Sequence, residues 1–279
     1  MLRTRLLTVA TIFPLFLLAL FYLPNSYWSA LILLLMVTAA HEWARLFDIR
    51  HAAAIAFAVS TLLIAGALCL GGSDALIPST FAIQVVCVVA TLFWVFVVPY
   101  MLKNRMHVSG RVSVLLLGWV VLIPLWAALV ELRRFGPLYV FFAMGVIWLA
   151  DTAAYFSGRA FGKHKLAPDI SPGKTVEGAF GALAVAALYA AILVVWGHRF
   201  GTMSLAGLPM MMIGFVVIVV LSIVGDLFES WIKRQCGKKD SGSLFPGHGG
   251  ILDRIDSLTS TMPVVVLALM CCKSIWGIL

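Results

Sequence analysis

The run AGLPMMMIGFVVIVVLSIVGDLF, residues 206–228, contains one charged side chain, Asp226, close to its end. A helix of about 20 mostly apolar residues is long enough to cross the hydrocarbon core of a bilayer. The run therefore predicts a membrane-spanning helix. An acid near the end of such a span is costly unless it is paired or bound to an ion, which makes Asp226 a candidate site residue.

The rest of the chain shares this apolar character. Of its 279 residues, 62% are hydrophobic and 11% are charged, whereas a soluble domain carries about 25% charged residues. This composition excludes a soluble globular protein, a disordered protein and a large domain outside the membrane. The apolar runs are continuous and not alternating, which argues against a lipid-exposed β-barrel. The expected fold class is therefore all-α, a polytopic membrane protein.

Nine apolar runs predict about nine transmembrane helices. Their bounds are 6–23, 27–41, 52–70, 80–102, 112–130, 137–157, 178–196, 206–228 and 258–277. The first run follows Arg3 and Arg5 but precedes no A-x-A cleavage site, so we interpret it as an uncleaved anchor. We expect an N-terminal region of five spans (1–136) and a C-terminal catalytic region of four spans (137–279).

The positive charge of the chain gathers on one side of the predicted spans. The net charge is +8, and an N-terminus in the cytoplasm places most Lys and Arg residues in cytoplasmic segments. The exceptions are Arg133, Arg134, Arg199 and Lys273. This asymmetry follows the positive-inside rule, so topology explains the charge without nucleic-acid binding. It predicts a cytoplasmic N-terminus and a C-terminus outside.

Two longer loops, 158–177 and 229–257, fall on the cytoplasmic side, and most of the chain's 12 acidic residues lie in these loops or near the cytoplasmic ends of spans. Two groups of side chains there share helix faces: Asp226, Glu229, Ser230 and Lys233 at the end of one span, and Asp253 and Asp256 at the start of the next, with Asp240 between them. Carboxylate oxygens are the ligands that Mg²⁺ prefers, together with substrate phosphates. The spacing therefore predicts a magnesium site.

Cations and glycines lie between these acids. They are Lys233, Arg234, Lys238 and Lys239, followed by Gly247, His248, Gly249 and Gly250. Lysine and arginine side chains bind phosphates, and glycine lets backbone N–H groups approach a ligand closely. Acids for a metal and cations for phosphates, at one membrane face, together indicate Mg²⁺-nucleotide chemistry.

The other loop, 158–177, has a similar composition. Lys163, Lys165 and Lys174 alternate with glycines after Asp151, which indicates a second phosphate-binding segment. The piece SPGKT is not a P-loop, because Pro168 stands where that motif requires glycine.

The segment from Ser230 to Asp256 resembles the signature of the phosphatidate cytidylyltransferases, also called CDP-diacylglycerol synthases. The matching positions are Ser230, Lys233, Arg234, Lys239, Asp240, Gly242, Pro246, His248, Gly249, Gly250, Asp253, Arg254 and Asp256. The resemblance implies an integral enzyme of the inner membrane that joins CTP and phosphatidic acid to give CDP-diacylglycerol and pyrophosphate in phospholipid biosynthesis. It also implies a nine-span homodimer with its active site facing the cytoplasm.

The resemblance further implies a Mg²⁺ ion, with a neighbouring K⁺, held by Asp226 and Asp253. The catalytic residues expected are Asp226, Asp253, Lys233, Arg234, Lys239, Asp240, His248, Arg254 and Asp256. The substrate-binding residues expected are Ser230, Lys163, Lys165, Lys174, Gly249 and Gly250.

Two other functions remain open from the sequence. A CTP-dependent polyprenol kinase has a similar membrane setting, and would release CDP instead of pyrophosphate. A transporter of nucleotides or anionic lipids also places acids within spans. A CDP-alcohol phosphotransferase is not expected, because its Asp-Gly-x-x-Ala-Arg motif is absent.

Overall fold

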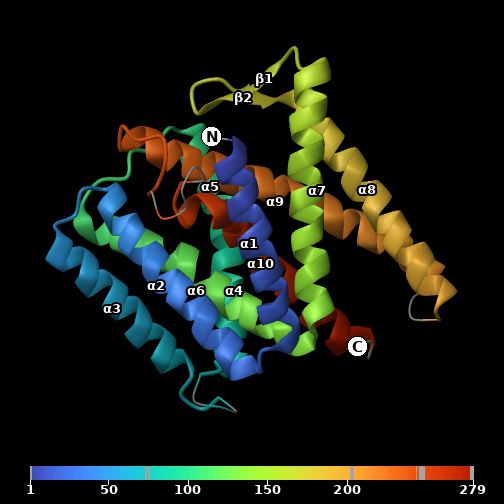
Figure 1. The fold of residues 1–279 in the computed structure, drawn as a ribbon, viewed down its shortest axis with the longest axis horizontal. Coiled ribbons are helices and arrows are strands. Elements are labelled where there is room, and N and C mark those ends of the chain that lie inside the picture. The colour runs from blue at the N-terminus through green and yellow to red at the C-terminus, as the bar shows by residue number, and fades with distance from the viewer. Residues whose placement is uncertain are drawn as a thin grey trace.

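The helices of this protein pack side by side into one bundle, seen in the computed structural model of Figure 1. The structure describes residues 2–72, 74, 76–201, 204–242, 244 and 249–276. The main helices are α1 (Leu2–Tyr22), α2 (Asn25–Leu46), α3 (His51–Leu68), α4 (Thr80–Leu92), α5 (Val98–Lys103), α6 (Arg111–Phe135), α7 (Pro137–Phe161), α8 (Val176–Arg199), α9 (Leu208–Gln235) and α10 (Leu252–Trp276). A short hairpin of β1 (Lys165–Ala167) and β2 (Ser171–Thr175) projects at one end of the bundle.

Each predicted span falls on a helical segment, and the polytopic all-α class is what the structure shows. Eight helical segments within the described residues are long and apolar enough to cross a membrane. One of them, Thr80–Lys103, joins α4 to α5 through a π-helical turn at Phe93–Val97. Helix α1 coincides with the first predicted span, and its described side chains form a shorter apolar stretch, Ala10–Tyr22. The total of nine spans stays a prediction.

Both loops that the sequence assigns to the cytoplasm are shorter than predicted. Helix α9 continues to Gln235 and α10 begins at Leu252, so the connection between them is residues 236–251, which we name the α9–α10 loop. The polar side chains of α9 extend the helix because Lys233 pairs with Glu229 one turn earlier. In the other loop, β1 pairs antiparallel with β2, with Lys165 opposite Thr175 and Ala167 opposite Ser171.

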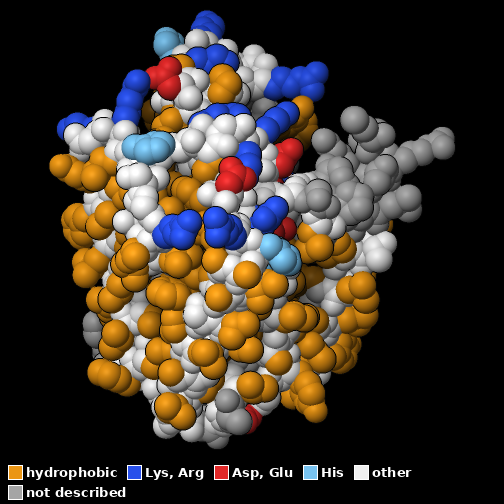
Figure 2. All heavy atoms as spheres, turned by 90° about the vertical axis from the view of Figure 1, so that its left-hand side faces the viewer, with side chains coloured by type: hydrophobic (Ala, Val, Ile, Leu, Met, Phe, Trp, Pro, Cys, Tyr) orange, Lys and Arg blue, Asp and Glu red, His pale blue; other side chains and the backbone are white. Residues whose placement is uncertain are grey.

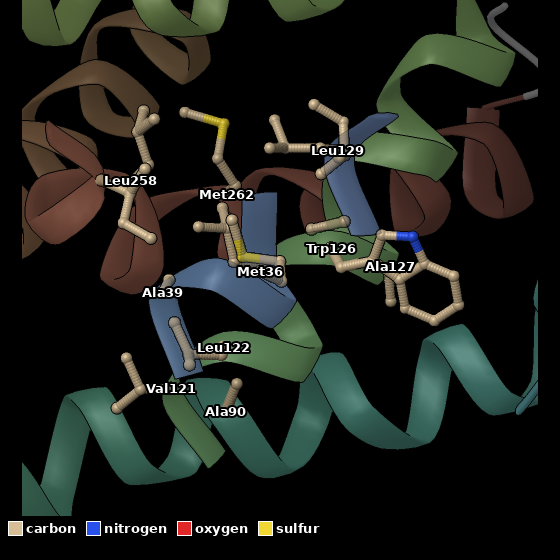
Figure 3. Close-up of a cluster of buried hydrophobic side chains, with 14 of the residues drawn as sticks. Met36, Ala39, Ala90, Val121, Leu122, Trp126, Ala127, Leu129, Leu258 and Met262 are labelled. Carbon is tan, nitrogen blue, oxygen red and sulfur yellow. The ribbon is translucent and has the colours of Figure 1, made fainter. Parts of the chain in front are cut away.

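Helices α2, α6 and α10 meet in the centre of the bundle. Met36 of α2, Trp126 of α6 and Met262 of α10 lie together in Figure 3, and all are nearly inaccessible to solvent. The buried indoles also donate hydrogen bonds between helices: Trp28 Nε1 to the Leu129 carbonyl at 3.1 Å, and Trp43 Nε1 to the Val114 carbonyl at 2.9 Å. Helices from both halves of the chain therefore share one core.

Charged side chains of both signs gather toward one end of the bundle. Figure 2 shows Lys, Arg, Asp and Glu gathered toward its upper end, while hydrophobic side chains cover most of the face below them. The upper end is the end that carries the β1–β2 hairpin and the start of α1 in Figure 1. An apolar belt below a charged end is the surface expected of a protein embedded in a bilayer.

Candidate active site

Asp253 occupies the first turn of α10 and connects three parts of the chain. Its Oδ2 accepts hydrogen bonds from the Gly250 N–H at 2.8 Å, the Ser241 N–H at 3.0 Å and the Ser241 hydroxyl at 2.9 Å. Its Oδ1 lies 2.6 Å from Lys233 Nζ of α9. A carboxylate at this position satisfies N–H groups that have no partner within the helix. Asp253 thus joins α10 both to its own loop and to α9.

Lys233 bridges two buried carboxylates. Its Nζ lies 3.1 Å from Glu229 Oε2 and 2.6 Å from Asp253 Oδ1, and the three side chains expose only 13%, 6% and 7% of their surface. The other oxygen, Glu229 Oε1, is buried and has no hydrogen-bond partner among the described residues. The positive charge of one lysine therefore offsets the negative charges of two carboxylates at a place where water screens them little.

Asp226 lies one turn before Glu229 and is held from the hairpin. Lys174 Nζ of β2 is 2.6 Å from Asp226 Oδ2, and the Ser230 hydroxyl donates to Asp226 Oδ1 at 3.2 Å. A second contact fastens the hairpin, between Arg105 and Asp169 at 2.5 Å. The structure thus brings the 158–177 segment against the acids of α9, which the sequence could place only at the same membrane face.

Two further acids complete this cluster. Asp256 of α10, Asp226 and Asp151 of α7 lie near enough for their negative charges to repel one another. The acid cluster, as we name it, consists of Asp151, Asp226, Glu229, Asp253 and Asp256. Only two ammonium groups, Lys174 and Lys233, form salt bridges with it among the described residues. The cluster therefore carries a formal excess of negative charge.

The donor chemistry of the acid cluster fits a hard cation. Its ligands are carboxylate oxygens, the type that Mg²⁺ selects, and Glu229 Oε1 has no other partner in the described chain. In the described ranges, no three Asp, Glu, His or Cys side chains come together as a metal site, so a bound cation would require the carboxylates to rearrange.

The other predicted site residues surround the cluster at the surface. Exposed positions on the same segments are Arg234, Lys239, Asp240, Arg254, Lys163 and Lys165. Lys163 lines a surface hollow together with Phe161 and Glu177, at the foot of the hairpin. His248, with Pro246 and Gly247, lies outside the described residues. Exposed cationic side chains thus lie on the segments that carry the acid cluster and on the hairpin.

Gly249 and Gly250 have a packing role in the structure. Gly249 has a φ of +80°, and a Cβ there would lie 2.4 Å from Asp253 Oδ2. A Cβ on Gly250 would lie 2.4 Å from Glu42 Oε2 and 2.5 Å from Ser241 Oγ. Glycine is therefore required here by conformation and by space. Contact of either residue with substrate stays a prediction.

Gly250→Ala is expected to lower both stability and activity. The added methyl group overlaps two polar atoms that cannot both move away, and overpacking of this kind costs about 1–3 kcal/mol. The melting temperature in detergent and the rate of product formation measure the two effects. Gly214→Ala on α9 is the matched control, because nothing lies within 4 Å of its Cβ position and its φ is not left-handed. Equal losses in the two variants would contradict the packing role of Gly250.

Glu42 and Lys238 have roles that the sequence did not indicate. Glu42 of α2 accepts hydrogen bonds from the Ile251 and Leu252 N–H groups, at 2.8 and 3.2 Å. Lys238, interpreted above as a phosphate ligand, instead donates to the Arg45 and Leu46 carbonyls at the end of α2. Lys238 also binds Asp48 and holds the pKa of that carboxyl below its usual value. The signal available in the sequence was an acid, Glu42, beside an apolar run.

Comparison with known proteins gives consistent matches. The cytidylyltransferase family matches residues 3–272. The phosphatidate cytidylyltransferase of Pseudomonas aeruginosa is 37% identical over 273 residues, which cover 95% of each chain. That of Haemophilus influenzae is 40% identical over 200 residues, covering 65% of this chain and 67% of the relative. That of Bacillus subtilis is 43% identical over 143 residues, half of each chain.

Proposed function

Because the chain belongs to the cytidylyltransferase family, it transfers a cytidylyl group from CTP to phosphatidate, and we propose that the acid cluster and the lysines around it are the site of this reaction. The observation that carries the proposal is the meeting of Lys174 and Lys233 with Asp226 and Asp253. It joins both predicted phosphate-binding segments in one place.

The proposed cofactor is Mg²⁺, held by Asp226 and Asp253, with Asp240 and Asp256 supporting it and K⁺ in a neighbouring position. The excess negative charge and the unpartnered Glu229 Oε1 support a cation here. When bound, Mg²⁺ screens the repulsion between two polyanionic substrates and stabilises negative charge on the departing pyrophosphate.

The nucleophile in the proposed reaction is the substrate's own phosphate. A phosphate oxygen of phosphatidate forms a bond to the α-phosphorus of CTP, while the bond from that phosphorus to the bridging oxygen of the β-phosphate breaks and pyrophosphate leaves. No protein base is needed, because the attacking phosphate is already an anion. Catalysis then rests on positioning and on electrostatic stabilisation.

The cations of the site would hold the phosphate oxygens. Lys233, Arg234, Lys239 and Arg254 would contact the reacting phosphates, with Ser230 beside them. Lys163, Lys165 and Lys174 would bind the nucleotide from the hairpin side, and His248 would orient a phosphate. Lys174 and Lys233 must exchange a carboxylate for a substrate phosphate, so substrate binding competes with the two shortest ion pairs of the cluster.

The proposed topology has nine spans, a cytoplasmic N-terminus and an active site that faces the cytoplasm from the inner membrane. Support comes from the charged end of the bundle, since the hairpin and the acid cluster lie at that end. Lipid tails would enter sideways between helices. This explains why an enzyme that uses water-soluble CTP is embedded in the membrane. A homodimer, implied by the resemblance, completes the proposal.

Purified protein in detergent, given phosphatidate and CTP labelled in the cytosine, tests this function. We expect labelled lipid and an equal amount of pyrophosphate. Release of labelled CDP, with no labelled lipid, would identify a kinase. No reaction, but exchange of nucleotide or lipid across reconstituted vesicles, would identify a transporter. The comparisons favour neither alternative.

A further inference from the structure

Glu42 is an acid of α2, only 9% exposed, whose carboxylate lies at the start of α10. Its Oε2 accepts the N–H groups of Ile251 at 2.8 Å and Leu252 at 3.2 Å. The first N–H groups of a helix have no acceptor within the helix, and the helix dipole favours a negative charge beside them. Glu42 therefore fixes the place at which α10 begins.

Asp253 completes the same set of hydrogen bonds from within α10. It accepts the Gly250 N–H at 2.8 Å, so two carboxylates share three successive N–H groups. The oxygen of Asp253 that accepts this bond is Oδ2, which leaves Oδ1 directed at Lys233. The direction of Oδ1 thus depends on the position of the first turn, which Glu42 holds from another helix.

The space around Glu42 fits a glutamate closely. A Cβ on Gly242 would lie 2.7 Å from Glu42 Oε1, and a Cβ on Gly250 would lie 2.4 Å from Oε2. The carboxylate therefore fills the gap between Gly242 and Gly250 of the α9–α10 loop. Because both carboxylate oxygens fit closely, Glu42 fixes the position of the first turn of α10 in addition to supplying a negative charge.

We propose that Glu42 is a positioning residue for cytidylyl transfer. By holding the first turn of α10, it sets the orientation in which Asp253 faces Lys233 and the acid cluster. The inference rests on the proposed function, in which Asp253 binds Mg²⁺. It assigns to the N-terminal half of the chain a part in the active site.

Glu42→Gln tests this proposal, because glutamine keeps the size and one carbonyl oxygen but removes the charge. We expect kcat to fall by about 10- to 100-fold, as for residues that orient metal ligands. The Mg²⁺ concentration needed for half-maximal rate should rise, while KM for phosphatidate stays within about twofold. Independently of activity, hydrogen exchange at the Ile251 and Leu252 amides should accelerate. Glu42→Asp, which keeps the charge but shortens the side chain, should show the same changes if the glutamine variant fails to fold.

Glu131→Gln is the matched control, since Glu131 is also a buried acid but pairs with Arg134 near the end of α6. It should leave the Mg²⁺ dependence and the exchange at residues 251 and 252 unchanged. Wild-type values of kcat, Mg²⁺ dependence and exchange in Glu42→Gln would overturn the proposal, as would identical shifts in Glu131→Gln. Failure of the wild-type protein to release pyrophosphate would instead overturn the proposed function, and the exchange rates would still decide whether Glu42 holds α10.

Discussion

Asp253→Asn is expected to reduce CDP-diacylglycerol formation by about 10²–10³-fold or more, the range seen when one electrostatic contact of a transition state is removed. Asparagine keeps a carbonyl oxygen that can accept the Gly250 and Ser241 hydrogen bonds, so the start of α10 should persist. The charge that pairs with Lys233, and that is proposed to bind Mg²⁺, is lost. Pyrophosphate release measures the rate, and gel filtration and melting temperature in detergent report the fold.

Asp48→Asn is the matched control for this variant. Asp48 is an exposed carboxylate, paired with Lys238 beyond the end of α2, and it belongs to no part of the acid cluster. Its replacement should leave the rate within about twofold, since exposed ion pairs contribute little. Normal turnover by Asp253→Asn at ordinary Mg²⁺ concentrations would remove Asp253 from the metal site.

Lys233→Met should abolish activity and also destabilise the protein. Removal of Lys233 leaves Glu229 and Asp253 facing each other without the cation that bridges them. Breaking a buried ion pair by deleting one partner costs about 3–5 kcal/mol. We expect a lower melting temperature in detergent without Mg²⁺, together with loss of product.

The double variant Lys233→Met/Glu229→Gln separates the two effects. Neutralising Glu229 removes one of the uncompensated charges, so a large part of the lost stability should return. Activity should not return, because Lys233, the proposed ligand of the substrate phosphate, is still missing. A wild-type melting temperature and normal turnover in the single variant Lys233→Met would contradict the bridging role of Lys233.

Much of the fold follows from the apolar runs, because a bilayer requires a continuous apolar helix for each crossing. The ends of the helices were harder to predict. Hydropathy set the end of the eighth span at residue 228, although the spacing of Glu229 and Lys233 already indicated helix beyond it; in the structure Lys233 pairs with Glu229 within α9 and with Asp253 of α10. The hairpin was missed because its residues are polar with Pro and Gly, and its contacts, such as Lys174 with Asp226, join distant parts of the chain.

Candidate site residues could be predicted where one segment carries several polar groups, and not where a single residue acts alone. Asp253 stands in a dense signature and Asp226 lies four residues before that signature begins, so the sequence predicts both as site residues. Glu42 stands alone in AAHEWA, and its partner Ile251 is 209 residues away. Local pattern contains no information about such a contact. The rule that an acid near the end of an apolar span indicates a site applied to Glu42 as well as to Asp226.

The attachment of α2 to the α9–α10 loop has a practical consequence for anyone who dissects or recombines this enzyme. Glu42 and Lys238 tie that helix to the loop from both directions. A C-terminal fragment with every signature residue would still lack α2, whose Glu42 holds the start of α10. Such a fragment should be inactive until the N-terminal fragment is supplied in trans. Chimeras between relatives should work only when the second helix and the loop are exchanged together from the same parent.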